Sequence, residues 1–263
     1  MPEGDTIHYA ARRIRPIGEG EIPDLATPHP RFGRDRWPER LAGRRLRSVD
    51  AHGKHLFLRF EGASSSEVDL TIHSHLRMTG SWGTYTAAER WHRAPQRAWL
   101  VLRTERGQVV QFDGPVLELL TDSRTRSDRR LALLGPDILA PELDEGEFLR
   151  RLRQYDPSRP IGEALLHQRT IAGIGNLWKC EGCFAAAIDP WRPTGRCSDE
   201  EALAIVRATR PRMQQSARDG MQDRHRVVYK APGRPCPRCG EPIRERGQGD
   251  ENRATFWCQS CQR

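Results

Sequence analysis

The chain has 263 residues, of which 37% are hydrophobic, and a formal net charge of +8. This length allows a substantial core in one or two domains. All but three of the 43 basic residues are arginine, and the three lysines are Lys54, Lys179 and Lys230. Arginine pairs well with phosphate and carboxylate, so the excess favours an anionic partner, although an arginine-rich genome would produce it too. No apolar run approaches the ~20 residues of a membrane span, which excludes an integral membrane protein.

Cysteine usage and the first residues indicate a compartment. The seven cysteines all lie in the C-terminal third of the chain. An odd, clustered set argues against a secreted disulfide framework and favours metal binding under reducing conditions. The acidic start, residues 1–6, lacks the apolar segment of a secretory signal. We therefore expect a soluble, cytoplasmic protein that does not bind membranes.

The N-terminal half predicts one helix followed by strands. Apolar residues recur at helical spacing from Ile7 to Ile14, Asp5 and Thr6 are candidate N-caps, and Pro16 should end the helix. Residues 17–43, rich in proline, glycine and arginine, predict a loop with some extended structure. Apolar runs then predict four strands, at residues 54–60, 68–76, 98–103 and 109–120. In the second run alternate residues should face opposite sides, with Val68, Leu70 and Ile72 on one side and Asp69, Thr71 and His73 on the other.

Helical patterns follow a polar, arginine-rich stretch at residues 121–130 that resembles a linker. The spacings Asp144-Glu147 and Ser198-Glu201 are typical of helix-capping boxes. Pro160 precedes a short apolar helix, and a glycine turn at residues 170–176 leads into another helix with Asn176 near its cap. From about Val227 we expect short strands around paired cysteines. The order predicts an α+β, multidomain fold with a β-rich part, a helical part and a small metal module.

Four cysteines have the spacing of a structural zinc site. The pairs Cys236/Cys239 and Cys258/Cys261 are two C-x-x-C motifs with eighteen residues between them. Four thiolates at this separation can close tetrahedrally around zinc and leave no open position for catalysis. We predict one structural Zn²⁺ in a zinc ribbon whose hairpin includes residues 255–257.

The remaining cysteines and two tryptophans predict core rather than function. Cys180 and Cys183 form a third C-x-x-C motif inside a predicted helix, without a second pair to complete a metal site. We expect these two and Cys197 to pack as small apolar residues, as opposed to a redox pair or a second metal site. Trp178 and Trp191 are likewise expected in the core and not as base-stacking platforms.

The N-terminus offers a candidate nucleophile. Methionine before proline is normally removed, which would expose Pro2 as a secondary amine. An α-amine titrates near 8, against about 10.4 for lysine, so a useful fraction is unprotonated at neutral pH. Its attack on an aldehyde carbon gives a positively charged iminium that acts as an electron sink. Glu3 beside it can move protons. Many unrelated proteins begin with Met-Pro-Glu, so these residues alone do not decide the chemistry.

Three further segments have both a functional and an ordinary interpretation. Lys54 lies at a glycine turn that opens a strand, where it binds an anion or is simply solvated. Asn176 follows Gly173-Ile174-Gly175 at a helix N-terminus, which is a phosphate site or an ordinary capped turn. Arg253 lies at the predicted tip of the ribbon hairpin, as a ligand-binding residue or part of a charged loop.

Together these segments resemble the formamidopyrimidine-DNA glycosylase and endonuclease VIII superfamily of DNA repair enzymes, over nearly the whole chain and in order. The opening Met-Pro-Glu-Gly resembles the endonuclease VIII branch, since the formamidopyrimidine branch typically starts Met-Pro-Glu-Leu-Pro. Residues 52–58 resemble the family's lysine strand, residues 171–176 its helix-two-turn-helix, and residues 253–262 its zinc finger.

The resemblance implies a role for each matching residue. Pro2 would attack C1′ of the damaged nucleotide, displace the base and form a Schiff base with the opened sugar. Glu3 would protonate the sugar ring oxygen. Lys54 and Arg253 would bind the phosphates that flank the lesion and assist the eliminations, and Asn176 would bind phosphate from the helix-two-turn-helix. Family members flip the damaged nucleotide out of the duplex, because its C1′ cannot be attacked inside the stack.

The resemblance also identifies a loop that fills the gap left by the flipped nucleotide. Residues 74–80 resemble the intercalating loop of the formamidopyrimidine branch, with His75 and Arg77 as DNA-binding residues and Met78 as the apolar wedge, which favours that branch. The alternative places Met78 in the core at the end of a strand. In the formamidopyrimidine branch the arginine that contacts the orphaned base lies in an Asp-Pro-Arg-Arg-Phe-Gly segment, whereas this chain has Asp-Gly-Pro-Val-Leu at residues 113–117. That arginine is therefore absent or supplied elsewhere, with Arg124 and Arg126 as candidates.

A second departure from the family concerns the substrate. The formamidopyrimidine branch has a long loop before the zinc finger that covers a flipped 8-oxoguanine. Here residues 217–225 lead almost directly into Val227, which is too short for that cover. We therefore expect oxidised pyrimidines, such as thymine glycol and dihydrouracil, and abasic sites as substrates.

These inferences predict a bifunctional DNA glycosylase and AP lyase of base excision repair that cleaves the strand by β,δ-elimination. Its domains would be an N-terminal catalytic β-sandwich with a leading helix (1–121), a linker (122–135), a helix-two-turn-helix domain (136–226) and a zinc ribbon (227–263). It would act as a monomer on damaged double-stranded DNA of the bacterial nucleoid, with zinc as its sole cofactor. The alternatives are a formamidopyrimidine-type enzyme for oxidised purines and a catalytically silent damage-binding protein.

Overall fold

The computed structural model describes residues 2–32, 35–64 and 66–263, which divide into two compact units. Unit 1 contains Pro2 and residues 6–132, and unit 2 contains Glu3–Asp5 with Leu133–Arg263. The short segment Glu3–Asp5 therefore belongs with residues more than a hundred positions away. This assignment separates Glu3 from the strands that follow it in sequence.

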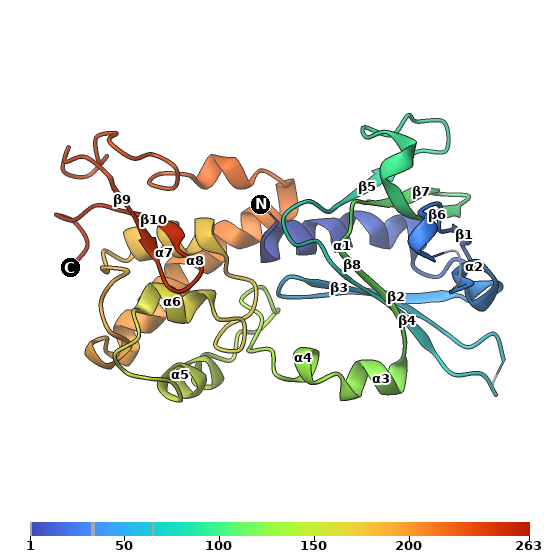
Figure 1. Cartoon of the computed structure of the whole chain (residues 1–263), viewed down its shortest axis with the longest axis horizontal. Coiled ribbons are helices and arrows are strands. Elements are labelled where there is room, and N and C mark those ends of the chain that lie inside the picture. Colours follow the sequence, from blue (N-terminus) through green and yellow to red (C-terminus); the bar gives the residue numbers. More distant parts are fainter. Residues whose placement is uncertain (1, 33–34, 65) are drawn as a thin grey trace. The chain divides into compact units, whose positions relative to one another are not determined.

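Helix α1 (Gly4–Gly18) confirms the predicted leading helix (Figure 1). Ile7, Ala11 and Ile14 are buried in the core of unit 1, as their spacing predicts. The expected N-caps, Asp5 and Thr6, are wrong because the helix already begins at Gly4. Pro16 also does not stop the helix, which continues to Gly18. In the last turn a proline removes a single backbone hydrogen bond, so the helix tolerates it there.

Two four-stranded antiparallel sheets form unit 1 (Figure 1), with strand orders β2-β3-β4-β8 and β1-β6-β7-β5. The strands of the first sheet are β2 (Leu46–His52), β3 (His55–Phe60), β4 (Leu70–His75) and β8 (Val116–Thr121). Those of the second are β1 (Asp24–Ala26), β5 (Ser81–Tyr85), β6 (Ala98–Thr104) and β7 (Gly107–Phe112). Apolar side chains of both sheets and of α1 share one core, which includes Leu58, Ile72 and Leu102. This confirms the predicted β-sandwich with a leading helix.

Several details of unit 1 differ from the sequence predictions. The run at residues 109–120 is two strands in different sheets, because Asp113 has a positive φ and Pro115 cannot donate to a ladder. Val68 lies outside β4 and is exposed, whereas Thr71 and His73 are buried. The predicted alternation fails because the second face of β4 is packed as well: His73 stacks on Phe57 and bonds to His55 and Glu118, and α3 (Asp122–Ser127) contacts the strand.

Some elements of unit 1 were not predicted from the sequence. Strands β2 and β5 were missed. The presumed loop at residues 17–43 contains β1 and the short helix α2 (Trp37–Leu41), along with one 3₁₀ turn, η1 (Pro30–Phe32). A second such turn, η2 (Pro95–Arg97), precedes β6, and the segment expected to be a linker contains α3 and α4 (Arg129–Ala132).

Unit 2 is mainly helical. Its elements are α5 (Glu145–Arg153), α6 (Ile161–Leu166), α7 (Asn176–Ala185), η3 (Thr194–Arg196), α8 (Asp199–Asp219) and η4 (Gln222–His225). The Asp144 side chain accepts a hydrogen bond from the Glu147 backbone N–H, and the capping box of Ser198 and Glu201 is complete. Residues 217–225, expected as a short loop, are the end of α8 and the turn η4.

The core of unit 2 surrounds α7. Cys180, Cys183, Cys197 and Trp178 are buried in it, which confirms that they are apolar core residues. Trp191 is half-buried and packs edge-on against Trp257.

A two-stranded hairpin ends unit 2 and lies against α7 (Figure 1). Strands β9 (Arg244–Gln248) and β10 (Arg253–Trp257) are antiparallel, with Arg253 directly opposite Gln248. Strand β10 includes residues 255–257, as predicted for the ribbon. The α+β fold with its cysteine-bearing C-terminal hairpin is therefore confirmed.

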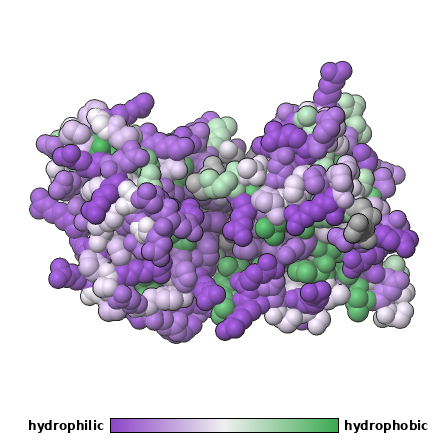
Figure 2. All heavy atoms as spheres, viewed as in Figure 1, coloured by the Kyte–Doolittle hydropathy of each residue, from purple (hydrophilic) through white to green (hydrophobic). Residues whose placement is uncertain are grey.

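Hydrophilic residues dominate the face drawn in Figure 2, with hydrophobic residues in small patches. Most large apolar side chains belong instead to the buried clusters of the two units. Among the residues that the structure describes, no helix combines the length and apolar character needed to cross a bilayer.

Candidate active site and metal centre

The Glu3 carboxylate binds the N-terminus of α7. Its oxygens accept hydrogen bonds from the backbone N–H groups of Gly175 (2.8 Å) and Leu177 (2.9 Å), with a longer contact from Trp178 (3.4 Å). The first turn of α7 has no side-chain cap of its own, since its N-cap residue is Gly175. Glu3 is only 1% exposed. A carboxylate from a distant segment thus satisfies helix N–H groups and benefits from the positive end of the helix.

Glycines make this close approach possible. The Gly4 N–H donates to the Gly173 carbonyl (2.9 Å), and a Cβ on Gly4 would lie 2.7 Å from the Gly173 Cα. A Cβ on Gly175 would lie 2.2 Å from the Glu3 carboxyl carbon. The glycine turn, which the sequence left open between a phosphate site and an ordinary capped turn, therefore receives the N-terminal segment. Next to it, the buried Asp5 accepts hydrogen bonds from Ser216 (2.5 Å) and Gln222 (3.0 Å).

Pro2 is half-buried and directly precedes this fixed carboxylate. Covalent geometry keeps Pro2 and Glu3 adjacent. A nucleophile at Pro2 and an acid/base group at Glu3 can therefore act on neighbouring atoms of one substrate. Met1, whose removal would free the Pro2 nitrogen, lies outside the described residues.

Asn176 binds the backbone of strand β10 at the residue next to Arg253. The Asn176 amide donates to the Ala254 carbonyl (2.7 Å), and Asn176 is buried at the start of α7. Arg253 is 38% exposed, and its guanidinium pairs with the Glu251 carboxylate, with an Nε to Oε2 distance of 2.6 Å. The structure thus places Glu3, Asn176 and Arg253 around one helix, which the sequence could not show.

The predicted residues of unit 1 gather at one end of the β3–β4 pair. Lys54 precedes His55 at the β2–β3 turn, and His55 is directly opposite His75 in the ladder. The Arg77 N–H donates to Nδ1 of His75 (3.1 Å), which leaves the His75 Nε2–H as a donor. Burial, followed by the nearby Arg77 and Lys54 charges, lowers the pKa of His75 to about 4. This imidazole is therefore a neutral donor at neutral pH.

Next to His75, two further histidines and a glutamate form a hydrogen-bonded chain that was not predicted from the sequence. His55 Nδ1 lies 2.8 Å from His73 Nε2, and His73 Nδ1 lies 2.9 Å from a Glu118 oxygen. An ionised Glu118 only accepts, so His73 donates to it and His55 donates to His73. Burial is also the main cause that lowers the pKa of His55, to about 2. In the sequence His73 only alternates with the apolar residues of a predicted strand, and this pattern does not indicate hydrogen bonds to His55 or Glu118.

Met78 is 63% exposed in the turn after β4. The alternative that it is a core residue is therefore wrong. Arg77 precedes it with a positive φ of 48°, so the two side chains lie on a tight turn. Arg126, a candidate for the missing base contact, forms an ion pair with Asp122 in α3.

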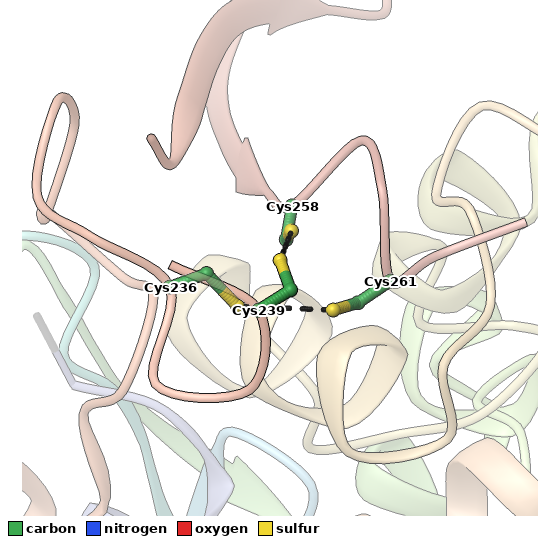
Figure 3. Close-up of side chains that lie close together, drawn as sticks. All are labelled: Cys236, Cys239, Cys258 and Cys261. Atoms are coloured by element: carbon green, nitrogen blue, oxygen red, sulfur yellow. Dashed lines mark hydrogen bonds between the residues drawn. The ribbon is translucent and has the colours of Figure 1, made fainter. Parts of the chain in front are cut away.

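The four predicted metal ligands come together (Figure 3). Cys236 and Cys239 come from the turn before β9, and Cys258 and Cys261 from the turn after β10. Their sulfur atoms all lie within 4.8 Å of one another, with Cys236 to Cys261 at 3.9 Å and Cys239 to Cys258 at 3.5 Å. Tetrahedral zinc with bonds of about 2.3 Å separates its sulfur ligands by about 3.8 Å. The cluster can hold a metal ion, and its geometry fits zinc.

Two polar side chains buried in α7 were not predicted from the sequence either. Lys179 of α7 contacts both strands of the β9–β10 hairpin, and Glu181 Oε1 accepts the backbone N–H groups of Val227, Val228 and Tyr229 at 2.8–2.9 Å. The sequence did contain one sign that Lys179 is unusual, because it is one of only three lysines and lies among apolar residues.

Comparison with known proteins agrees with this architecture. The model of the formamidopyrimidine-DNA glycosylase N-terminal domain matches residues 1–116, and that of the family's H2TH domain matches residues 134–225. The chain therefore belongs to the formamidopyrimidine-DNA glycosylase family, as its motifs predict.

The names of similar proteins indicate the branch of the family to which the chain belongs. Over its whole length the chain is 38% identical to a protein named probable endonuclease 8 2 from Streptomyces coelicolor, and the match covers 94% of that protein. It is 35% identical to 99% of DNA-(apurinic or apyrimidinic site) lyase Nei2 from Mycolicibacterium smegmatis, again over its full length. These relatives place it on the endonuclease 8 branch. The fold matches that of Lactococcus lactis Fpg in a complex with a DNA containing N7-benzyl-Fapy-dG, with a TM-score of 0.81, 23% identity and full coverage of both chains.

Proposed function

We propose that this protein removes oxidised pyrimidines from damaged double-stranded DNA, with Pro2 as the nucleophile and Glu3 as the acid. It is a DNA glycosylase and AP lyase, as the family and the names of its relatives, endonuclease 8 2 and AP lyase Nei2, indicate. The observation that carries the residue assignment is the buried Glu3 carboxylate, held by α7 directly beside Pro2.

The chemistry follows from these two residues. After removal of Met1, the Pro2 nitrogen attacks C1′ and the bond from C1′ to the base breaks, so that the base leaves with the proton that the amine loses. Glu3, in its protonated form, then delivers a proton to the ring oxygen, the bond from C1′ to that oxygen breaks, and the nitrogen lone pair forms the C1′=N double bond of an iminium. The resulting iminium is cationic and acidifies the hydrogens on C2′. Loss of such a proton expels the 3′ phosphate by β-elimination, and a further elimination expels the 5′ phosphate. Hydrolysis of the iminium then returns the free amine.

Phosphate binding is proposed for the polar groups on both units. Lys54, His75 and Arg77 lie at one end of the β3–β4 pair, and Asn176 and Arg253 lie around α7. A neutral His75 with its Nε2–H as donor suits a phosphate oxygen. The Arg253 guanidinium pairs with Glu251 through Nε and one terminal nitrogen, is partly exposed, and has further N–H groups for a phosphate. Met78, with its exposed thioether, would fill the gap left by the flipped nucleotide.

The four cysteines are proposed to hold one structural zinc ion. When bound, the ion would close the two turns that flank β9 and β10 and stabilise the hairpin that carries Arg253. Four thiolates fill a tetrahedral ion, so zinc here would have no position for substrate. We propose the domain limits given by the sequence, with a zinc finger at residues 227–263, and a monomer that acts on nucleoid DNA in the cytoplasm.

Borohydride trapping tests the nucleophile. Reduction of the iminium by borohydride should link the protein covalently to abasic-site DNA, since an amine nucleophile is required. Pro2→Gly should strongly reduce trapping with little change in DNA affinity, because it removes the secondary amine. Absence of trapping by the wild-type protein would instead support a silent damage-binding protein.

A second experiment tests the acid. Glu3→Gln should abolish excision of thymine glycol but retain some cleavage at preformed abasic sites, where no glycosidic bond must break. Normal thymine glycol excision by Glu3→Gln would refute this assignment. Wild-type excision of 8-oxoguanine opposite cytosine faster than thymine glycol, at matched salt under single-turnover conditions, would indicate an oxidised-purine enzyme.

A further inference from the structure

Lys179 is a fully buried lysine in the middle of unit 2, with 0% of its side chain exposed. Its ammonium donates to the Thr255 hydroxyl (2.5 Å) and to the Gln248 side-chain oxygen (3.2 Å). Both partners are neutral. Burial lowers the pKa of Lys179 and the nearby Arg253 charge adds to this shift, while the Glu3 charge opposes it. Burying an ammonium group without an ion-paired partner is costly, and an apolar side chain in its place would commonly be as stable. Stability alone therefore does not explain a lysine here.

The two partners of Lys179 flank Arg253 in the hairpin. Gln248 is the residue directly opposite Arg253 in the β9–β10 ladder. Thr255 lies two residues beyond Arg253 on β10, and its hydroxyl lies 3.2 Å from the Arg253 carbonyl oxygen and 3.1 Å from the Gln248 oxygen. The Gln248 amide in turn donates to the Pro190 carbonyl (2.8 Å). The ammonium is thus linked to the backbone at Arg253 through both strands of the hairpin, by Gln248 on β9 and by Thr255 on β10.

The helix that carries Lys179 also holds Glu3. Asn176, Lys179 and Cys180 lie on one face of α7, at i, i+3 and i+4. They contact three successive β10 residues, through the Ala254 carbonyl (2.7 Å), the Thr255 hydroxyl and the Phe256 N–H (3.4 Å to sulfur). The first turn of the same helix binds the Glu3 carboxylate. A single rigid element therefore fixes both Glu3 and the strand that begins at Arg253.

We propose that Lys179 is a positioning residue for Arg253. Its ammonium fixes the β9–β10 hairpin against α7, so that the Arg253 guanidinium projects from a constant place relative to Glu3. The inference rests on the proposed role of Arg253 in DNA binding. It assigns Lys179 no contact with substrate, because the side chain is buried.

A double-mutant cycle tests this role. The assay is single-turnover cleavage of preformed abasic-site DNA, together with DNA affinity at fixed salt. Lys179→Met should lower cleavage about tenfold, the loss expected when a charge-assisted hydrogen bond is removed. If Lys179 acts through Arg253, adding Lys179→Met to Arg253→Ala should change the rate by less than about twofold. Multiplicative losses in the double variant would overturn the proposal.

Two further variants separate positioning from folding. Thr255→Val removes the hydroxyl link but keeps the lysine, so it should reproduce part of the loss even if Lys179→Met folds poorly. Thr209→Val is the matched control, because its buried hydroxyl donates to the Ile205 carbonyl within α8, at 2.7 Å, and lies against α7 at Gly182. It should retain cleavage. An equal loss in Thr209→Val would overturn the proposal in favour of general core damage.

Hydrogen exchange without DNA provides a readout independent of the proposed function. Backbone amides of residues 248–255 should exchange faster in Lys179→Met, with the zinc content unchanged. Unchanged exchange would overturn the positioning role. Faster exchange combined with normal cleavage in both Lys179→Met and Arg253→Ala would support the positioning role and refute the function proposed for Arg253.

Discussion

Replacing Gly175 by alanine should displace Glu3, the proposed catalytic acid, without changing its chemistry. The backbone of Gly175 is extended, with φ −122° and ψ −164°, so alanine fits the conformation without strain. Its methyl group would lie 2.2 Å from the Glu3 carboxyl carbon and 2.6 Å from Oε1. Ordinary contacts are 3.4–4 Å, so the carboxylate must move by about 1 Å or more to restore normal packing.

This displacement breaks the hydrogen bonds that hold Glu3. The contacts to Gly175 and Leu177 are 2.8 and 2.9 Å, and hydrogen bonds to a charged group contribute about 1.5–3 kcal/mol each. Because water can replace part of these hydrogen bonds, we expect the free energy of unfolding to fall by about 2–4 kcal/mol. A folded protein typically has a free energy of unfolding of about 5–15 kcal/mol, so the variant should still fold. The melting temperature should fall by roughly 4–10 °C. A misplacement of about 1 Å should slow excision about 100-fold.

The assay compares two substrates under single-turnover conditions. Excision of thymine glycol should fall about 100-fold, as a misplaced acid implies, whereas cleavage at preformed abasic sites should fall much less. The control is Gly146→Ala in α5, where the new methyl meets only an Asp144 oxygen at 3.5 Å. This helical substitution should leave activity unchanged and add up to about 1 kcal/mol of stability. Thymine glycol excision at the wild-type rate by a folded Gly175→Ala variant would refute the reasoning about Glu3.

Three other predictions concern the proposed zinc ion, the proposed role of Met78 as a wedge, and pH. Chelation of the metal should weaken DNA binding more than Arg253→Ala does, because the whole ribbon loses its support; cleavage of abasic DNA at full rate after chelation would contradict this. Met78→Ala should slow excision from duplex far more than from single-stranded DNA, and equal losses on both would show that Met78 fills no gap. Because burial holds the folded-state pKa values of His55 and His75 at about 2 and 4, below the unfolded value of about 6.5, the unfolded chain binds more protons as the pH falls through 6.5. The melting temperature should therefore decrease from pH 7 to pH 5, and His55→Phe should reduce that slope; an unchanged slope would show that His55 does not titrate in this way.

Local patterns in the sequence were enough to predict much of the fold. The spacing from Ile7 to Ile14 predicted α1, and alternating apolar runs predicted most strands of the first unit, because periodicity depends on neighbouring residues alone. The predictions failed where a distant element changed the environment. His73 and Thr71 looked solvent-facing, but both are buried, and His73 contacts His55, Phe57 and Glu118 of the neighbouring strands. Pro16 looked like a terminator, although the final turn of α1 accommodates it.

For the candidate site, the sequence by itself determined the chemical groups: an N-terminal Pro-Glu pair, a turn lysine, a glycine turn and four cysteines in two C-x-x-C motifs. Their order and spacing also identified the family. Only the tertiary structure decided what holds these groups in place. Glu3 binds backbone N–H groups 172 and 174 residues away, and Lys179 reaches Thr255 across 76 residues. Such contacts leave no periodic trace in the sequence, because they depend on how separate elements pack and not on the local repeat of either one.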